Sequence, residues 1–149
     1  MKGYAFFSGM LIPVWLFCGV LIAGSLHPGY SHVDQAMSEL GALEAPTHQL
    51  SPIINNFPLG VLFLLFGGAV VGLFSGARLA QFSGLLLMLH GLASIGAGLF
   101  ACDPGCNPVE PSRDQVLHNL SGLVMFSLAD LGQLAVGVSG AQTPGVGRL

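Results

Sequence analysis

Charged side chains are scarce in this chain. Asp, Glu, Lys and Arg make up 7% of its 149 residues, whereas soluble domains carry about 25%. The mean hydropathy is +0.75, so there is too little charge to cover a soluble globule. The four basic residues form no patch, and the net charge is −3. Nothing is available to neutralise a phosphate backbone, and we predict no nucleic-acid partner.

Familiar catalytic and metal-binding motifs are missing as well. The chain has no G-x-S-x-G, no H-E-x-x-H and no paired C-x-x-C, and each of these motifs would have indicated a specific chemistry. No linker rich in Ser, Pro or charge divides the sequence. We therefore predict one domain over residues 1–149, with no metal and no cofactor assigned.

What the sequence has instead is long apolar runs. They cover residues 4–26, 53–74, 79–101 and 116–139. Each is long enough to cross a hydrocarbon core of ~30 Å, which takes about 20 helical residues. The predicted fold is an all-α integral membrane four-helix bundle, with residues 140–149 as a tail. The first run exceeds the ~7 to 15 apolar residues of a signal peptide, so we expect it to be retained.

The basic residues predict the orientation of these helices. Three of them fall on the side of the two termini: Lys2, Arg78 and Arg148. Only Arg113 falls on the other side. Since basic residues favour the cytoplasmic face, we expect a cell-membrane protein, in the inner or plasma membrane, with both termini in the cytoplasm. The loops 26–52 and 102–115 then lie outside.

The first outer loop contains an amphipathic pattern. Over residues 32–40 apolar side chains recur at the i, i+3, i+4, i+7 spacing of one helical face: Val33, Ala36, Met37 and Leu40. With Ser31 before the pattern and Gly41 after it, we predict a short interfacial helix. Such a helix lies on the membrane surface. It would either anchor the loop or contact a ligand.

Start signals precede two of the spans. Ser51 and Pro52 predict an N-cap and first turn for the second helix, which we expect Pro58 to bend, with Asn55 and Asn56 helping to satisfy the freed carbonyl. An S-x-x-Q capping box opens the fourth helix at Ser112. Helices three and four also carry small residues that would let helices approach closely.

Most groups capable of chemistry lie on the outer side. The candidate pocket comprises His27, His32, Glu39, Asp103 and His118. It would bind a lipid headgroup or a small solute. The alternative is a membrane-embedded hydrolase or lipid-modifying enzyme that uses a histidine and a carboxylate as general base, with or without metal. Whether the protein is an enzyme stays open. We expect membrane lipids as partners, and leave a homo-oligomer open.

Two cysteines flank a tight turn in the second outer loop. Pro104 and Gly105 are typical of the centre of a type II turn, which would bring Cys102 and Cys106 together. A disulfide is the prediction for this side of the membrane, while zinc and free thiols remain alternatives. Cys18, inside the first run, is expected to be a packing residue.

Two polar residues fall inside the predicted membrane. His90 lies ~16 Å deep by helical rise, whereas His118 is at the outer mouth, so the two cannot share a haem. Asp130 is costly in lipid and should face the bundle interior with a partner. It would serve either as a proton or ion relay or as a polar clamp between helices.

The outer segments resemble a known family. Residues 30–41, YSHVDQAMSELG, followed by APT at 45–47, are similar to a signature of the DUF998 membrane proteins, as are FACDPGC at 100–106 and LHN at 117–119. The resemblance implies a multipass protein without an assigned activity. It points to Ser38, Glu39, Cys102, Asp103, Cys106 and His118. That family usually has more helices than the four runs seen here, so the chain is either a short form or truncated.

Overall fold

The fold is all-helical throughout the part of the chain that the structure describes. The computed structural model covers the backbone of residues 2–141 and the side chains of residues 3, 4 and 6–128. Its α-helices are α1 (Lys2–Ser25), α2 (Phe57–Leu73), α3 (Arg78–Leu99) and α4 (Arg113–Ala141). Short 3-10 helices occur at η1 (Met37–Gly41) and η3 (Pro104–Cys106), and a π-helical turn, η2 (Pro52–Asn56), precedes α2. The predicted all-α class is confirmed.

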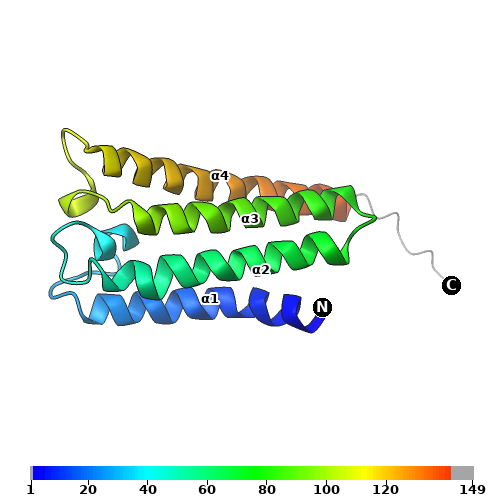
Figure 1. Ribbon diagram of the computed structural model, residues 1–149, viewed down its shortest axis with the longest axis horizontal. Helices are drawn as coiled ribbons and strands as arrows, with labels where there is room; N and C mark the ends of the chain where they lie inside the picture. The colour runs from blue at the N-terminus through cyan, green and yellow to red at the C-terminus, as the bar shows by residue number, and fades with distance from the viewer. Residues whose placement is uncertain (1, 142–149) are drawn as a thin grey trace.

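The helices lie side by side in chain order (Figure 1). α2 packs between α1 and α3, and α3 packs between α2 and α4. Along their described lengths, α1 and α4 do not pack on one another. The four-helix bundle that we expected is therefore not confirmed, because the described helices form an open layer.

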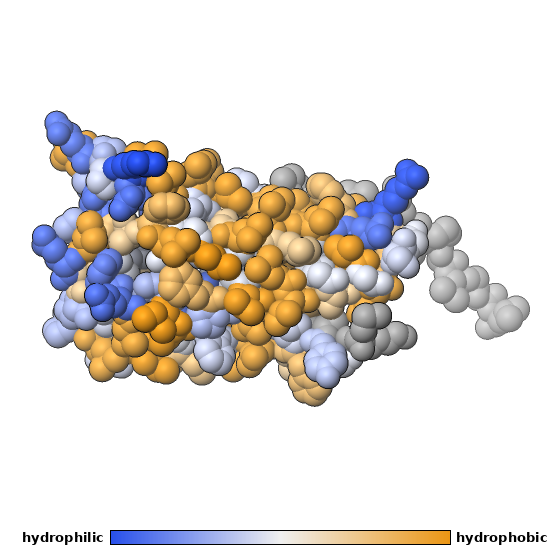
Figure 2. Space-filling view, in the orientation of Figure 1, coloured by the Kyte–Doolittle hydropathy of each residue, from blue (hydrophilic) through white to orange (hydrophobic). Residues whose placement is uncertain are grey.

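Three helices are long and apolar enough to cross a membrane. They are Phe6–Ser25, Pro52–Leu73 and Arg78–Leu99. Orange, apolar side chains cover the middle of the molecule in Figure 2, and hydrophilic ones gather toward its ends. Large side chains such as Phe7, 71% exposed, line this surface, which suits contact with lipid and not with water. The chain is a membrane protein. The fourth expected span, 116–139, extends beyond the described side chains.

Reciprocal glycine pairs bring α2 and α3 together. A Cβ on Gly60 would lie 2.8 Å from the Gly91 carbonyl oxygen, and one on Gly91 would lie 2.6 Å from that of Gly60. Gly67 and Gly84 repeat the arrangement at 2.5 and 2.8 Å. Small residues allow this backbone approach in lipid, where packing drives association. The close approach that we expected from the small residues of helix three is therefore confirmed, and its partner is α2. Gly122 of α4 makes no such approach, because a Cβ there would have no atom of the described residues within 4 Å.

The entry to α2 differs from the prediction. Helical backbone already includes Leu50 and Ser51. Ser51 has φ −56 and ψ −50, and its N–H donates to the Thr47 carbonyl at 2.8 Å, so Ser51 is not the N-cap. The chain then widens into η2, just before Pro58. Proline lacks an N–H and its ring crowds the carbonyl four residues earlier, which accounts for a widened turn at this point.

Trp15 of α1 satisfies the carbonyl that Pro58 frees. Pro58 cannot donate to Ile54, four residues before it, and the Trp15 indole N–H donates to the Ile54 carbonyl at 2.7 Å. We had expected Asn55 and Asn56 to help. Instead, Asn56 joins α3, because its carbonyl accepts from the Ser94 hydroxyl at 2.9 Å. Among the residues that the structure describes, the buried Oδ1 atom of Asn55 has no hydrogen-bond partner.

The first loop is not a continuous helix over residues 32–40. The Ser31 hydroxyl accepts from two following backbone N–H groups and so closes a local turn, and Ala36 is extended at φ −71 and ψ 145. Only η1 is helical. The Glu39 carboxylate accepts from the Ala36 N–H at 2.9 Å and thus caps this short helix. Leu40 is fully buried while Val33 is 92% exposed, so the predicted apolar face is split.

Candidate functional site

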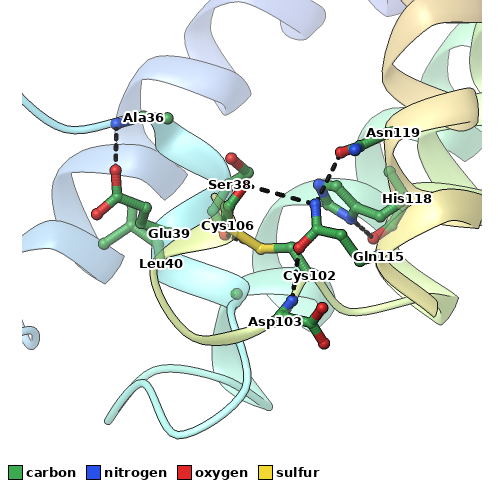
Figure 3. The surroundings of a disulfide bond; sticks show 12 residues. Ala36, Ser38, Glu39, Leu40, Cys102, Asp103, Cys106, Gln115, His118 and Asn119 are labelled. Carbon is green, nitrogen blue, oxygen red and sulfur yellow. Dashed lines mark hydrogen bonds between the residues drawn. A yellow bond between two sulfur atoms is a disulfide. The ribbon is translucent and has the colours of Figure 1, made fainter. Parts of the chain in front are cut away.

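Two loops, residues 26–51 and 100–112, lie together at one end of the helices. With the first turns of α4 they form what we call the polar cap, and Gln115 lies at its centre (Figure 3). The Gln115 side chain is 1% exposed. Its Oε1 accepts from the Asp103 N–H at 2.8 Å, and its Nε2 donates to Asn119 Oδ1 at 2.8 Å. A second, longer contact reaches the Cys106 carbonyl. Gln115 therefore ties the loop between α3 and α4 to α4 itself. Sequence reasoning assigned it only a capping role.

Asp103 completes the start of α4. The Ser112 hydroxyl accepts from the Gln115 N–H at 3.1 Å, which confirms half of the predicted capping box. The Ser112 N–H donates to Asp103 Oδ2 at 2.9 Å instead of to Gln115. The buried Asp103 carboxylate is thus held by a structural bond at the helix N-terminus, where negative charge is favourable.

The predicted disulfide joins Cys102 to Cys106, whose Cα atoms are 5.0 Å apart. Gly105 between them has φ 72 and ψ 3, which are the values of the third residue of a type II turn. The Cys102 carbonyl accepts from the Leu43 N–H at 2.8 Å, so the disulfide loop also holds the loop that follows α1. The expectation for Cys18 is wrong: this free cysteine is exposed.

His118 binds the end of α3. Its Nδ1 lies 2.8 Å from the Phe100 carbonyl oxygen and 3.1 Å from that of Ala97. Because carbonyls only accept, Nδ1 carries the proton. The last carbonyls of a helix have no hydrogen-bond donors within that helix, and His118 of α4 provides a donor for those at the end of α3. The ring joins two neighbouring helices at the cap.

Two further histidines are used in the same way. His48 Nδ1 donates to the Gly41 carbonyl at 3.0 Å and steadies the first loop. His90 Nδ1 donates to the Met125 carbonyl at 3.1 Å, and its ring centroid lies 4.2 Å from that of Phe63. His90 therefore links α2, α3 and α4. The side chain of Asp130, the other predicted intramembrane polar group, lies outside the described residues.

Glu39 does not join the groups around His118. Its carboxylate accepts from the Ala36 N–H and from Gln35 Nε2, at 2.9 and 2.7 Å. In Figure 3 it points toward Ala36 and away from the disulfide. Among the described side chains, no group of three or more His, Cys, Asp or Glu residues could hold a metal ion. The structure thus divides the five candidate residues between separate parts of the cap.

The remaining two candidates meet at Tyr30. Its ring centroid lies 5.7 Å from that of His27 and 5.0 Å from that of His32. His27 Nδ1 is buried and has no hydrogen-bond partner within the described part of the chain. Burial raises the pKa of the Tyr30 phenol above its ordinary value, and the nearby negative charge of Glu39 raises it further. Sequence reasoning missed Tyr30, although its position between two histidines was a usable signal.

Three apolar helices with a disulfide-closed polar cap define a helical integral membrane protein. The chain matches the family described as "Protein of unknown function (DUF998)" over residues 10–149. It belongs to the DUF998 family, as the resemblance predicted. Comparison with curated proteins and with solved structures gave no match.

Proposed function

We propose that this chain is a non-catalytic protein of the cell membrane that binds a lipid headgroup through His27, Tyr30 and His32. One observation carries the proposal. Three of the five histidines have donated a ring N–H to a backbone carbonyl, whereas no such bond occupies His27 or His32 among the described residues. These two rings gather on one tyrosine beside the end of α1.

The chemistry of this cluster suits a phosphate. Each histidine ring can donate an N–H, while phosphate oxygens only accept. The Tyr30 hydroxyl already donates to the Gln35 carbonyl at 3.5 Å, so the two histidines are the donors and Tyr30 holds their rings together. Glu39 is already held by two donors, so its charge is partly offset. Inorganic phosphate offers the same acceptors as a lipid headgroup, and the two are separated by experiment.

The hydrolase alternative requires a histidine paired with a carboxylate. The described histidine rings that make hydrogen bonds make them to backbone carbonyls. Asp103 and Glu39 accept from backbone N–H groups. These bonds favour structural roles for the groups that an enzyme would use, and a binding protein is the better proposal.

The proposed orientation places both termini in the cytoplasm and the cap outside. Arg78 begins α3 at the end opposite the cap, and the disulfide lies within the cap. Basic residues favour the cytoplasm and disulfides persist outside it. Both features support the same orientation.

Binding of a short-chain phosphatidylcholine to the purified protein in detergent tests the proposal. Replacing His27→Phe together with His32→Phe keeps the ring contacts to Tyr30 but removes the donors. Two lost hydrogen bonds of about 1 kcal/mol each should weaken binding by about tenfold or more.

His48→Phe is the matched control, because it removes a ring donor that serves the fold and should leave lipid affinity unchanged. Unchanged affinity in the His27/His32 double variant contradicts the proposal. Equal binding of inorganic phosphate alone would identify a solute site and not a lipid site.

A further inference from the structure

An apolar groove runs between α1 and α2. It is a shallow groove of about 500 Å³ that is open to the surface over most of its length; its lining includes Trp15, Phe57, Pro58 and Val61. None of the predicted site residues lines it. The residues 53–61 of its wall rise about 12 Å along the helix, starting from the end of α2 that carries the cap.

Local packing explains why the groove is there. Two glycines of α1 lie at close contacts: a Cβ on Gly9 would lie 2.9 Å from the Phe66 ring of α2, and one on Gly19 would overlap the side chain of Asn55 in η2. Trp15 lies between these two points along α1. Pro58 and Val61 line the groove on the facing helix.

We infer that this groove binds one acyl chain of a membrane lipid. α1 and α2 both contain candidate membrane spans, so the groove is continuous with the surface that faces hydrocarbon. Its walls are apolar side chains. The Trp15 N–H is already bonded to the Ile54 carbonyl at 2.7 Å, so no donor remains for a polar occupant, which would be costly to bury there.

The position of the groove selects the leaflet. Because it begins at the cap end of α2, it receives a chain from a lipid whose headgroup lies at the cap. The inference goes beyond the proposed headgroup site and does not require it, since the groove and the Tyr30 cluster share no residue.

Retention of lipid after purification tests this inference. Native mass spectrometry of the wild-type protein, purified from membranes and washed in detergent, should show one bound phospholipid. Val61→Phe fills the groove and should reduce the retained lipid by about tenfold. Leu65→Phe is the matched control: Leu65 lies on α2, is 60% exposed and does not line the groove, so retention should stay at the wild-type level.

The sole tryptophan gives a second measurement that needs no substitution. After incubation with a phosphatidylcholine brominated along its chains and dilution into excess detergent, Trp15 fluorescence should remain quenched. Equal lipid retention in Val61→Phe and Leu65→Phe would overturn the inference. So would full recovery of fluorescence on dilution, or a dimer mass without lipid. The His27/His32 double variant should keep the quenching, so failure at either site can be recognised separately.

Discussion

Two adjacent glycines of α2 allow a sharp test of helix packing. Gly67 faces Gly84 of α3, whereas Gly68 has nothing within 4 Å of the position that a Cβ would take. Replacing either glycine with alanine adds a single methyl group to the same helix. The two variants differ only in what that methyl meets.

The expected difference follows from the distances. Both substitutions gain the same helix propensity, about 1 kcal/mol, so this contribution cancels when they are compared. At Gly67 the new Cβ would lie 2.5 Å from the Gly84 carbonyl oxygen and 2.9 Å from the Met88 nitrogen. These are backbone atoms that cannot rotate away, so the helices must separate. Overpacking of this kind costs about 1–3 kcal/mol.

Reversible unfolding of the purified protein in mixed micelles, followed by circular dichroism, measures the effect. Gly67→Ala should lower the free energy of unfolding by about 1–3 kcal/mol relative to Gly68→Ala. Gly84→Ala should behave like Gly67→Ala, since each glycine faces the other. Equal stability of the Gly67 and Gly68 variants would refute the close backbone approach of α2 and α3.

Two other predictions concern α1 and the first loop. Trp15→Phe should destabilise the protein by about 1 kcal/mol, because it removes the hydrogen bond to the Ile54 carbonyl. The loss should be smaller in a Pro58→Ala background, where the backbone N–H of residue 58 can bond to that carbonyl. Additive effects in the double-mutant cycle would argue against Trp15 as the partner of the carbonyl that Pro58 frees. In a Tyr4→Phe variant, Tyr30 should ionise above the ordinary pKa of 10.0. The stabilisation from its neutral phenol is present below that value and is lost as pH rises through the higher folded pKa. Tyrosinate absorbance provides the readout, and a midpoint at or below 10.0 would contradict the burial of the phenol.

The membrane-spanning character and the disulfide could be predicted because each depends on local sequence. Run length alone indicates a span, and within the described residues three of the four runs form helices that are long and apolar enough to cross a membrane. Pro104 and Gly105 define the turn between the two cysteines whatever surrounds them. The helix that the amphipathic pattern predicted over residues 32–40 does not form. The side chains of Ser31 and Glu39 accept hydrogen bonds from backbone N–H groups that would donate to backbone carbonyls in a continuous helix.

The candidate site was harder to predict because its residues meet partners from distant segments. No spacing in the sequence shows that His118 lies beside the last carbonyls of α3, or that Asp103 accepts from the Ser112 N–H. The sequence does not distinguish a polar residue that hydrogen-bonds to the end of a helix from one that binds a ligand. Only the neighbouring helix distinguishes them.

The hydrogen bond between Leu43 and Cys102 has a consequence for how the protein matures in the membrane. It joins two loops that are separated in the chain by a complete pair of spans. In the orientation proposed above both loops lie outside, and the first loop then emerges during synthesis before its partner exists. The second loop must then cross and be oxidised before it can bind the first. The cap can therefore be completed only after both helix pairs, α1 with α2 and α3 with α4, have been inserted.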